Sequence, residues 1–225
     1  DAELAENNGL GSNLPKARTI PTRITQFLVF MTRDVRSKIA DKQYMLINFF
    51  ETPVLAIILA LLVRFYANDE TGYVFRENDN IPAYMFMCVV VALFFGLTVS
   101  AEEIIKDRKI IKREKFLNLS RSSYLVSKII IMFFISLVQT GSFVLIGNSI
   151  LEVGGMNMAY FLVLFSTACF ANMLGLNISA SFRNAVTIYI LIPFLIIPQL
   201  LLSGVIVEFD KLSPGFSSDE YVPIT

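Results

Sequence analysis

Five long apolar stretches alternate along the chain with segments that carry most of the charge. Within each stretch the apolar residues would cover every side of a helix, whereas a helix on a water-soluble domain keeps one polar face. Each stretch is about as long as the ~20 residues that cross ~30 Å of hydrocarbon at ~1.5 Å per residue. The pattern therefore predicts an all-α, polytopic helical bundle in a membrane, with five spans over residues 46–66, 83–100, 129–147, 158–181 and 185–207.

The basic residues lie almost entirely in alternate connections between these spans. Sixteen of the nineteen Lys and Arg residues fall in segments 1–45, 101–128 and 182–184, and the other three are Arg64, Arg76 and Lys211. Positively charged loops are retained on the cytosolic side of a membrane, which fixes the orientation of the helices. We therefore expect the N-terminus and the loop between the second and third spans to be cytosolic.

A different pattern precedes the first span. Apolar residues recur at helical spacing on one side of residues 21–44, and basic and polar residues occupy the other side. This predicts an amphipathic helix, which either lies in the lipid headgroup layer or packs against a soluble domain. The apolar side holds Ile24, Phe27, Leu28, Met31, Val35 and Ile39, and the polar side holds Arg23, Gln26, Arg33, Arg36 and Lys38.

The rest of the chain divides around this helix and the spans. Residues 1–20 are rich in Asn, Gly, Pro and Ser and are interpreted as a linker from an upstream region. Residues 45–207 form the predicted transmembrane domain, and residues 208–225 the start of an outer loop. Five crossings leave that last segment outside, so we expect the sequence to be a fragment of a longer polypeptide.

Two spans contain polar residues that allow two interpretations each. Glu51, in the first span, is either an interfacial carboxylate tethered by an inner basic residue such as Lys42 or a functional acid within the membrane. The fifth span contains Pro193, Pro198 and Gln199. Proline kinks a helix and frees carbonyl groups, so this span either lines a transport pathway or is only a bent structural helix.

The cytosolic segment 101–124 between the second and third spans has charges of both signs and a helical composition. Mixed charges with interspersed isoleucines are suited to docking on a soluble partner, because they combine electrostatic steering with apolar contact. The alternative is a solvated loop whose only role is to hold positive charge inside.

Composition limits the chemistry that this segment could perform. The chain has no His, and its two cysteines, Cys88 and Cys169, fall inside predicted spans, so we expect no metal site and no disulfide framework. No Gly-x-x-x-x-Gly-Lys-Ser/Thr motif for nucleotide phosphates occurs. An intramembrane enzyme would depend on Glu51 alone. We expect a non-enzymatic segment without catalytic residues, without its own cofactor and without a nucleic-acid partner.

Several local motifs support a more specific prediction. The cytosolic loop reads Asp107-Arg108-x-x-Ile111-x-Arg113-Glu114, followed by Ser122-Ser123-Tyr124-Leu125-x-x-Lys128. Further on come Asn177-x-Ser179-Ala180-x-x-x-Asn184-Ala185-Val186 and Leu202-Ser203-Gly204-Val205-Ile206-Val207. In their order and placement between the spans, these motifs resemble the membrane domain of type-2 ABC transporters, in particular exporters of subfamily G, over about residues 22–210.

This resemblance implies a permease half of an ATP-driven exporter that works by alternating access on an apolar or amphiphilic substrate. The full domain would have six spans and would pair with a second membrane half, identical or different. A separate or upstream ABC ATPase domain would bind ATP and Mg²⁺, and the bacterial inner membrane would be the location. The alternative is a membrane scaffold or force-transmitting subunit without a transported substrate.

The resemblance also implies roles for particular residues. The loop would couple to the ATPase through Asp107, Arg108, Arg113 and Glu114. An apolar plug above the transport cavity would be formed by Val205 and Ile206. The cavity itself would lie between the second and fifth spans, where the candidate lining residues are Phe94, Thr98, Ile197, Gln199 and Leu200.

Overall fold

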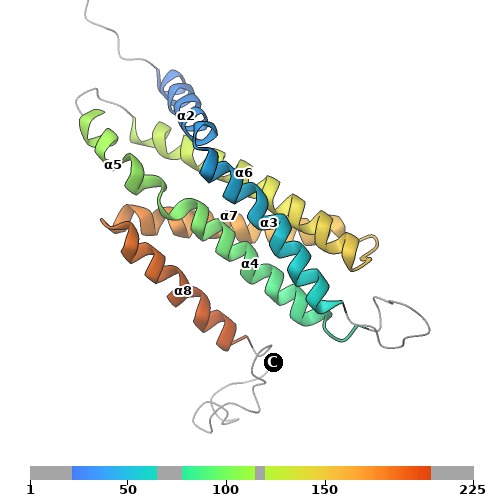
Figure 1. Ribbon diagram of the computed structural model, residues 1–225. Helices are drawn as coiled ribbons and strands as arrows, with labels where there is room; N and C mark the ends of the chain where they lie inside the picture. Colours follow the sequence, from blue (N-terminus) through green and yellow to red (C-terminus); the bar gives the residue numbers. More distant parts are fainter. Residues whose placement is uncertain (1–21, 65–77, 115–119, 204–225) are drawn as a thin grey trace, which may run out of the picture.

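All the secondary structure in the described part of the chain is helical, as the apolar pattern predicted. The computed structural model describes residues 22–64, 78–114 and 120–203. Within hydrocarbon, every backbone N–H and C=O group needs a partner inside the protein, and a helix supplies these partners within one segment. The helices are α2 (Arg23–Ala40), α3 (Lys42–Val63), α4 (Ile81–Ala101), α5 (Glu103–Glu114), α6 (Arg121–Ile150), α7 (Asn157–Ser181) and α8 (Ala185–Leu201) (Figure 1).

The predicted spans correspond to five of these helices. Four helical stretches, which contain α3, α4, α6 and α7, are long and apolar enough to cross a membrane, and α8 is a shorter apolar helix of 17 residues. The predicted continuation of the fifth span, residues 204–207, lies outside the described residues. Helix α6 begins at Arg121, eight residues before the predicted span. Its first two turns therefore continue the membrane helix on the side predicted to be cytosolic.

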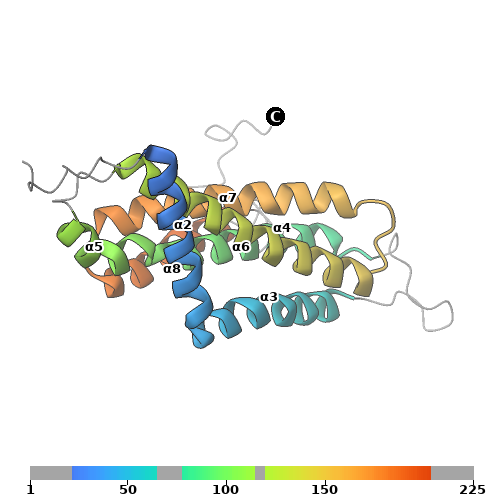
Figure 2. The same ribbon diagram turned by 90° about the horizontal axis from the view of Figure 1, so that it is seen from above.

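Helices α2 and α3 are separated by a single residue, Asp41. The backbone N–H of Asp41 donates to the carbonyl of Ser37, and its carboxylate accepts from the amide of Tyr44 at 3.0 Å. Asp41 thus ends one helix and caps the next, a role for which Asp is well suited. Figure 2 shows the chain turning sharply at this point, so that α2 crosses the end of the bundle while α3 runs along it.

The closest helix packing is between α4 and α7, where small residues meet. A Cβ atom added to Gly96 would lie 2.5 Å from Cβ of Ala171 and 2.6 Å from the carbonyl oxygen of Ala168. The hydroxyl of Ser100 is turned back to the carbonyl of Gly96 at 2.6 Å, close to Gly175 on the facing helix. Small residues allow backbones to approach closely, which drives helix association in membranes.

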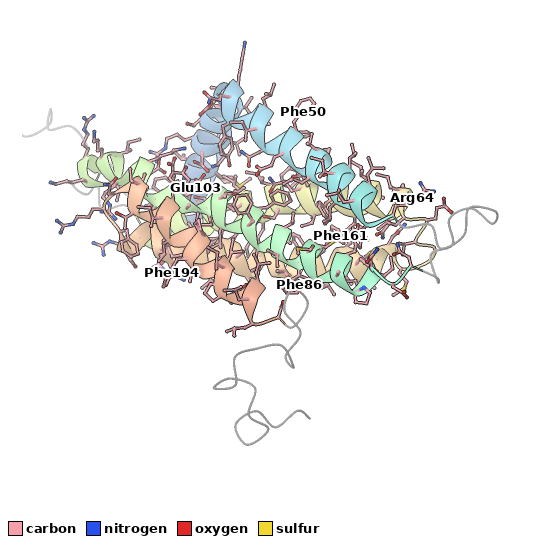
Figure 3. All side chains as sticks on the ribbon, turned by 60° about the horizontal axis from the view of Figure 1, so that its bottom comes forward. Phe50, Arg64, Phe86, Glu103, Phe161 and Phe194 are labelled. Carbon is pink, nitrogen blue, oxygen red and sulfur yellow. The ribbon has the colours of Figure 1, made fainter. Side chains whose placement is uncertain are left out.

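The outward faces of the helices are apolar. Phe50 on α3 and Phe194 on α8 are 64% and 70% exposed, and both point away from the bundle in Figure 3. The core lies inside, around Phe95 of α4 and Phe143 of α6, whose rings meet edge to face with centroids 6.4 Å apart. This inversion of the usual outer surface is expected where lipid, rather than water, is the solvent.

The structure shows which residues of α2 face the bundle. On the predicted polar side, Gln26 is buried and Lys38 is largely buried. The apolar residues Ile24 and Leu28 are instead 73% and 52% exposed. Gln26 and Lys38 face the protein because they find polar and charged partners there, whereas Arg23 and Arg36 of the same side stay exposed. The exposed apolar residues suit a helix that lies in a lipid interface.

Candidate coupling site at the predicted cytosolic end

Three helices meet at the predicted cytosolic end of the bundle, and each contributes two side chains four residues apart. Residues with this spacing lie on the same face of a helix, one above the other. The pairs are Asp34 and Lys38 on α2, Glu103 and Asp107 on α5, and Tyr124 and Lys128 on α6. Asp34, Lys38, Glu103, Asp107 and Lys128 are called the inner ion cluster below.

Lys128 is the centre of the inner ion cluster. Its ammonium Nζ lies 2.5 Å from Oδ1 of Asp34, 2.9 Å from Oε2 of Glu103 and 2.9 Å from Oδ2 of Asp107. Glu103 also forms an ion pair with Lys38. Asp34 comes from α2 and Asp107 from α5, so a single ammonium group holds two helices against the start of α6.

The cluster is charged but nearly closed to solvent. Lys128 is 3% exposed and Glu103 is 6% exposed, and Figure 3 places Glu103 where α2 meets the start of α5. Burial by itself raises the pKa of Glu103, but the charges of Lys38 and Lys128 outweigh it and hold the pKa below the usual value for a carboxylate. The carboxylate of Glu103 therefore depends on the two ammonium groups that face it.

Aromatic side chains border the cluster. The hydroxyl of Tyr124 donates to Oδ2 of Asp107 at 3.0 Å, and its ring meets the ring of Phe30 on α2 edge to face at 5.7 Å. The ammonium of Lys38 lies 4.9 Å from the centre of the Tyr44 ring at the start of α3. These contacts extend the junction to α3 and support the charges with cation–π attraction.

Helix α5 is also fastened to the end of α7. The first amides of a helix have no partner within it, and here the hydroxyl of Ser179 accepts from Ile104 N and Ile105 N at 3.1 and 3.3 Å. In return, Nη2 of Arg108 donates to the carbonyls of Ala180 and Phe182 at 3.1 and 2.9 Å. A cation at a helix C-terminus is favourable because the last carbonyls carry partial negative charge.

Polar contacts also fasten α2 to the first turn of α6. Oε1 of Gln26 accepts from the backbone amide of Ser120 at 2.7 Å, and the hydroxyl of Ser123 donates to the carbonyl of Arg23 at 3.0 Å. With the inner ion cluster and the contacts to α7, these bonds join α2, α5, α6 and α7 at one end of the bundle. A displacement of α5 would therefore reach several helices at once.

The predicted coupling residues are placed in two different settings. Asp107 and Arg108 face the protein and anchor α5 to α6 and α7. Arg113 is exposed near the end of α5. Glu114 is the last residue of this helix, and its side chain lies outside the described part. The exposed residues of α5 on which a partner could dock are Lys106, Lys109, Ile110, Lys112 and Arg113.

The candidate cavity residues lie on α4 and α8, which pack against each other. Phe94 is 37% exposed and Ile197 is 51% exposed, and Gln199 is exposed as well. Leu200 packs against the core formed by α4, α7 and α8, and the hydroxyl of Thr98 is bound to carbonyls of its own helix. The candidate plug residues, Val205 and Ile206, lie outside the described residues.

Glu51 was predicted to be either an interfacial carboxylate tethered by a basic residue or a functional acid within the membrane. It is partly buried on α3, about two and a half turns inside the helix start. In the described ranges it forms no ion pair with Lys42 or another basic residue, so the predicted tether is not present there. Pro53 follows within the same helix.

Asp34 and Glu103 were not singled out from the sequence, Lys38 was noted only on the polar side of the amphipathic helix, and Lys128 only as part of a motif. A usable signal did exist. Asp34 and Lys38 stand four residues apart in an amphipathic helix, and Glu103 and Asp107 repeat this spacing in the loop. Their partner could not be read from the sequence, because Lys128 is 94 residues from Asp34.

Comparison with known proteins identifies the family of this bundle. A family model described as ABC-2 type transporter matches residues 25–219. The chain belongs to the ABC-2 type transporter family. It is also 26% identical over 192 residues to the ABC transporter ATP-binding/permease protein Rv1747 of Mycobacterium tuberculosis. That match covers 80% of this chain and 22% of the relative, so the chain spans about a fifth of the length of the curated protein it matches.

The matched range includes nearly all of α2 and every later helix. These helices are therefore the membrane, or permease, component of an ABC transporter, and not its nucleotide-binding domain. Together with the apolar helices of sufficient length, the family places the chain in the class of integral multi-pass membrane proteins.

Proposed function

We propose that this ABC-2 domain is one permease half of an ATP-driven exporter, and that the inner ion cluster carries the force of ATP hydrolysis into the spans. The observation that supports this most directly is the placement of Lys128. Its three carboxylate partners tie α2 and α5 to α6. A push on the exposed side of α5 would move α2, α6 and α7 together, as required for a rigid-body switch between two packed states.

The energy would come from an ABC ATPase domain, either upstream in the same polypeptide or separate, which would hold ATP and Mg²⁺. The name of the mycobacterial relative couples ATP binding and permease in one protein, which supports a fused arrangement. The basic exposed surface of α5 would meet this domain, with Arg113 and Glu114 at the contact. We place the transporter in the bacterial inner membrane.

Transport would take place between two membrane halves, identical or different, with a cavity between α4 and α8 of each. Phe94 and Ile197 are exposed on these helices, which suits residues that face either a second half or a substrate. An apolar lining would accept an apolar or amphiphilic substrate, with Val205 and Ile206 closing the cavity above. Alternating access needs no catalytic residue; it needs substrate affinity that differs between the two states.

The coupling proposal is tested by exchanging the two charges at the end of α5. In the full-length protein in proteoliposomes, the variant Arg113→Glu with Glu114→Arg should insert normally and hydrolyse ATP. It should nevertheless lose transport, because the docking charges no longer match. A matched control is Arg183→Glu, a charge reversal at an exposed residue between α7 and α8, which should transport normally. Unchanged transport in the exchanged variant would contradict docking at this position.

The second candidate function is a scaffold or force-transmitting subunit without a transported substrate. The inner ion cluster supports this function as well as export, because it would transmit any movement of α5, whether or not a substrate is transported. The two functions differ in their response to substrates. An ATPase rate that rises when candidate amphiphiles are added to the full-length protein would argue against the scaffold.

A further inference from the structure

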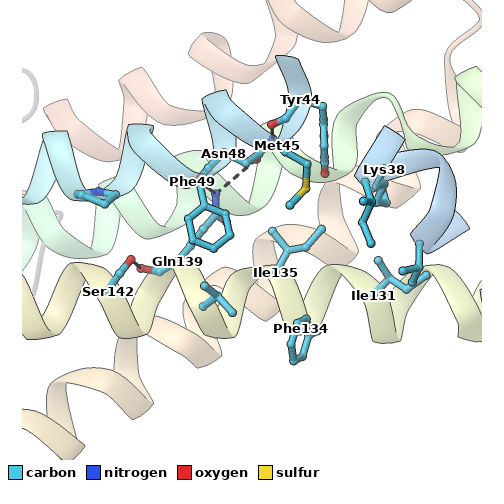
Figure 4. Close-up of a pocket in the computed structure, with 14 residues that line it drawn as sticks. Lys38, Tyr44, Met45, Asn48, Phe49, Ile131, Phe134, Ile135, Gln139 and Ser142 are labelled. Atoms are coloured by element: carbon cyan, nitrogen blue, oxygen red, sulfur yellow. Dashed lines mark hydrogen bonds between the residues drawn. The ribbon is translucent and has the colours of Figure 1, made fainter. Parts of the chain in front are cut away.

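A groove with a volume of about 300 Å³ lies where α2, α3 and α6 meet (Figure 4). Most of its wall is apolar and includes Phe49 of α3 and Phe134, Ile135 and Val138 of α6. Helix α8 packs on α4 and α7 instead. The groove is therefore separate from the cavity proposed between α4 and α8.

The groove extends over the depth of one lipid leaflet. Along α3 it is lined from Tyr44 to Pro53, nine residues that rise by about 14 Å at ~1.5 Å per residue, or about half of a ~30 Å hydrocarbon layer. The end of the groove near Tyr44 includes Lys38, a member of the inner ion cluster. This end therefore lies at the predicted cytosolic boundary and is called the cytosolic end below. This length fits one acyl chain of the cytosolic leaflet, and the volume is at the small end for a ligand site.

Two polar groups at the cytosolic end of the groove indicate where the ester and headgroup of a lipid would bind. The hydroxyl oxygen of Tyr44 is buried and has no hydrogen-bond partner among the described residues, although a buried donor normally has one. Lys42 is exposed at the start of α3. It lies two helical turns before Phe49 and therefore on the same face of the helix. A donor and a cation at this depth match an ester carbonyl and a phosphate.

A polar contact between α3 and α6 also lies in the lining of the groove. Nε2 of Gln139 donates to the backbone and side-chain oxygens of Asn48, both at 3.4 Å (Figure 4). This pair ties α6 to α3, and both residues line the groove together with Phe49 and Phe134.

We propose that this groove binds one acyl chain of an anionic glycerophospholipid of the cytosolic leaflet, with its ester carbonyl at the Tyr44 hydroxyl and its phosphate at Lys42. The bound lipid would fill the space between α2, α3 and α6 and so support the junction above the inner ion cluster. The proposal rests on the membrane placement of the helices and not on the transport cycle.

Photo-crosslinking in lipid nanodiscs tests this site. The full-length protein is reconstituted in phosphatidylcholine discs that contain a small fraction of phosphatidylglycerol with a diazirine in one acyl chain. Mass spectrometry then maps the cross-linked residues. We expect saturable cross-links at Phe134 and Val138. Cross-links spread equally over all exposed apolar faces would overturn the site, because they describe ordinary lipid around the protein.

Filling the groove provides a matched pair of variants. Val138→Trp should lower the cross-linking yield in the groove about tenfold, equivalent to 1.4 kcal/mol of binding free energy. Leu137→Trp, one residue away on the 43% exposed lipid side of α6, should leave the yield unchanged. If Val138→Trp does not fold, Ile135→Phe fills the same space with a smaller change. Equal yields in the filled and control variants would contradict the proposal.

The contacts to the lipid headgroup and ester are tested separately from those to the acyl chain. Tyr44→Phe removes only the hydroxyl and keeps the ring near Lys38, and we expect the yield to fall by about threefold, as for the loss of one modest hydrogen bond. Lys42→Gln should abolish the preference for phosphatidylglycerol over a phosphatidylcholine probe with the same chain. Lys112→Gln, at an exposed position on α5, should keep that preference. A wild-type protein that labels equally with both probes would overturn the anionic assignment.

Discussion

At the scale of single residues, Lys128 is the residue whose substitution we expect to affect the stability of the protein most. Its ammonium is almost fully buried and faces three carboxylates. One of these, Glu103, also pairs with the ammonium of Lys38. Moving two charges out of water is costly, so a buried ion pair contributes less than its attraction suggests. Removing one partner is a different matter, because the charges that remain are then buried without compensation.

We therefore expect Lys128→Met to lower the free energy of unfolding by about 3–5 kcal/mol, since it leaves carboxylates buried without their counter-ion. Thermal unfolding in detergent, followed by circular dichroism, measures the change. Lys106→Met is the matched control. Lys106 of α5 pairs with Glu102, the residue between α4 and α5, and its side chain is 59% exposed, so its loss should cost less than about 1 kcal/mol. Similar losses in both variants would show that the buried cluster contributes no more to stability than an exposed ion pair.

At the scale of elements, the contact between α4 and α7 depends on the absence of side chains. The space beside Gly96 is already filled by Ala171 and by the backbone of Ala168. Gly141, on α6, is different. A Cβ atom there would have its nearest neighbour at 3.8 Å, on the ring of Phe161. The two glycines therefore separate close packing from helix propensity.

Gly96→Ala should destabilise the protein by about 1–3 kcal/mol, because the added methyl group forces α4 and α7 apart. In contrast, Gly141→Ala should leave stability unchanged or raise it by up to about 1 kcal/mol, since Ala favours the helix and meets no obstacle. Unfolding of both variants in the same detergent gives the comparison. A Gly96→Ala protein as stable as the wild type would show that the α4–α7 contact adapts freely.

At the scale of the whole molecule, the orientation of the bundle follows from charge outside the spans. Lys109 is exposed on α5, at the end that carries the inner ion cluster, and Gly154 lies in the connection between α6 and α7 at the other end. The positive-inside pattern predicts that Lys109 is in the cytosol and that Gly154 is outside.

Single cysteines test this orientation. In a background where Cys88 and Cys169 are replaced by Ala, we expect Lys109→Cys to react with a membrane-impermeant maleimide only from the cytosolic side. Gly154→Cys should react only from the exterior, where an added side chain meets nothing within 4 Å. Right-side-out and inside-out vesicles distinguish the two faces. Labelling of the Lys109→Cys protein from outside would reverse the topology and remove the proposed ATPase contact.

The sequence by itself determined the helices and their membrane setting. An apolar run of about twenty residues has few alternatives in lipid, since backbone groups must be bonded within the segment. The amphipathic pattern of α2 and the loop motifs are equally local, and they led to the family that the match over residues 25–219 confirms. The predicted coupling, cavity and plug residues stay predictions.

Only the tertiary structure decided which polar faces meet. The sequence placed Gln26 and Lys38 on the polar side of α2 without identifying their partners, and it suggested Asp107 and Arg108 as coupling residues. The structure turns all four side chains towards neighbouring helices. The inner ion cluster joins residues up to 94 positions apart. The groove beside Tyr44 arises from three separate helices. Such contacts depend on how the helices pack, and local periodicity contains no information about the partner that a given face will find.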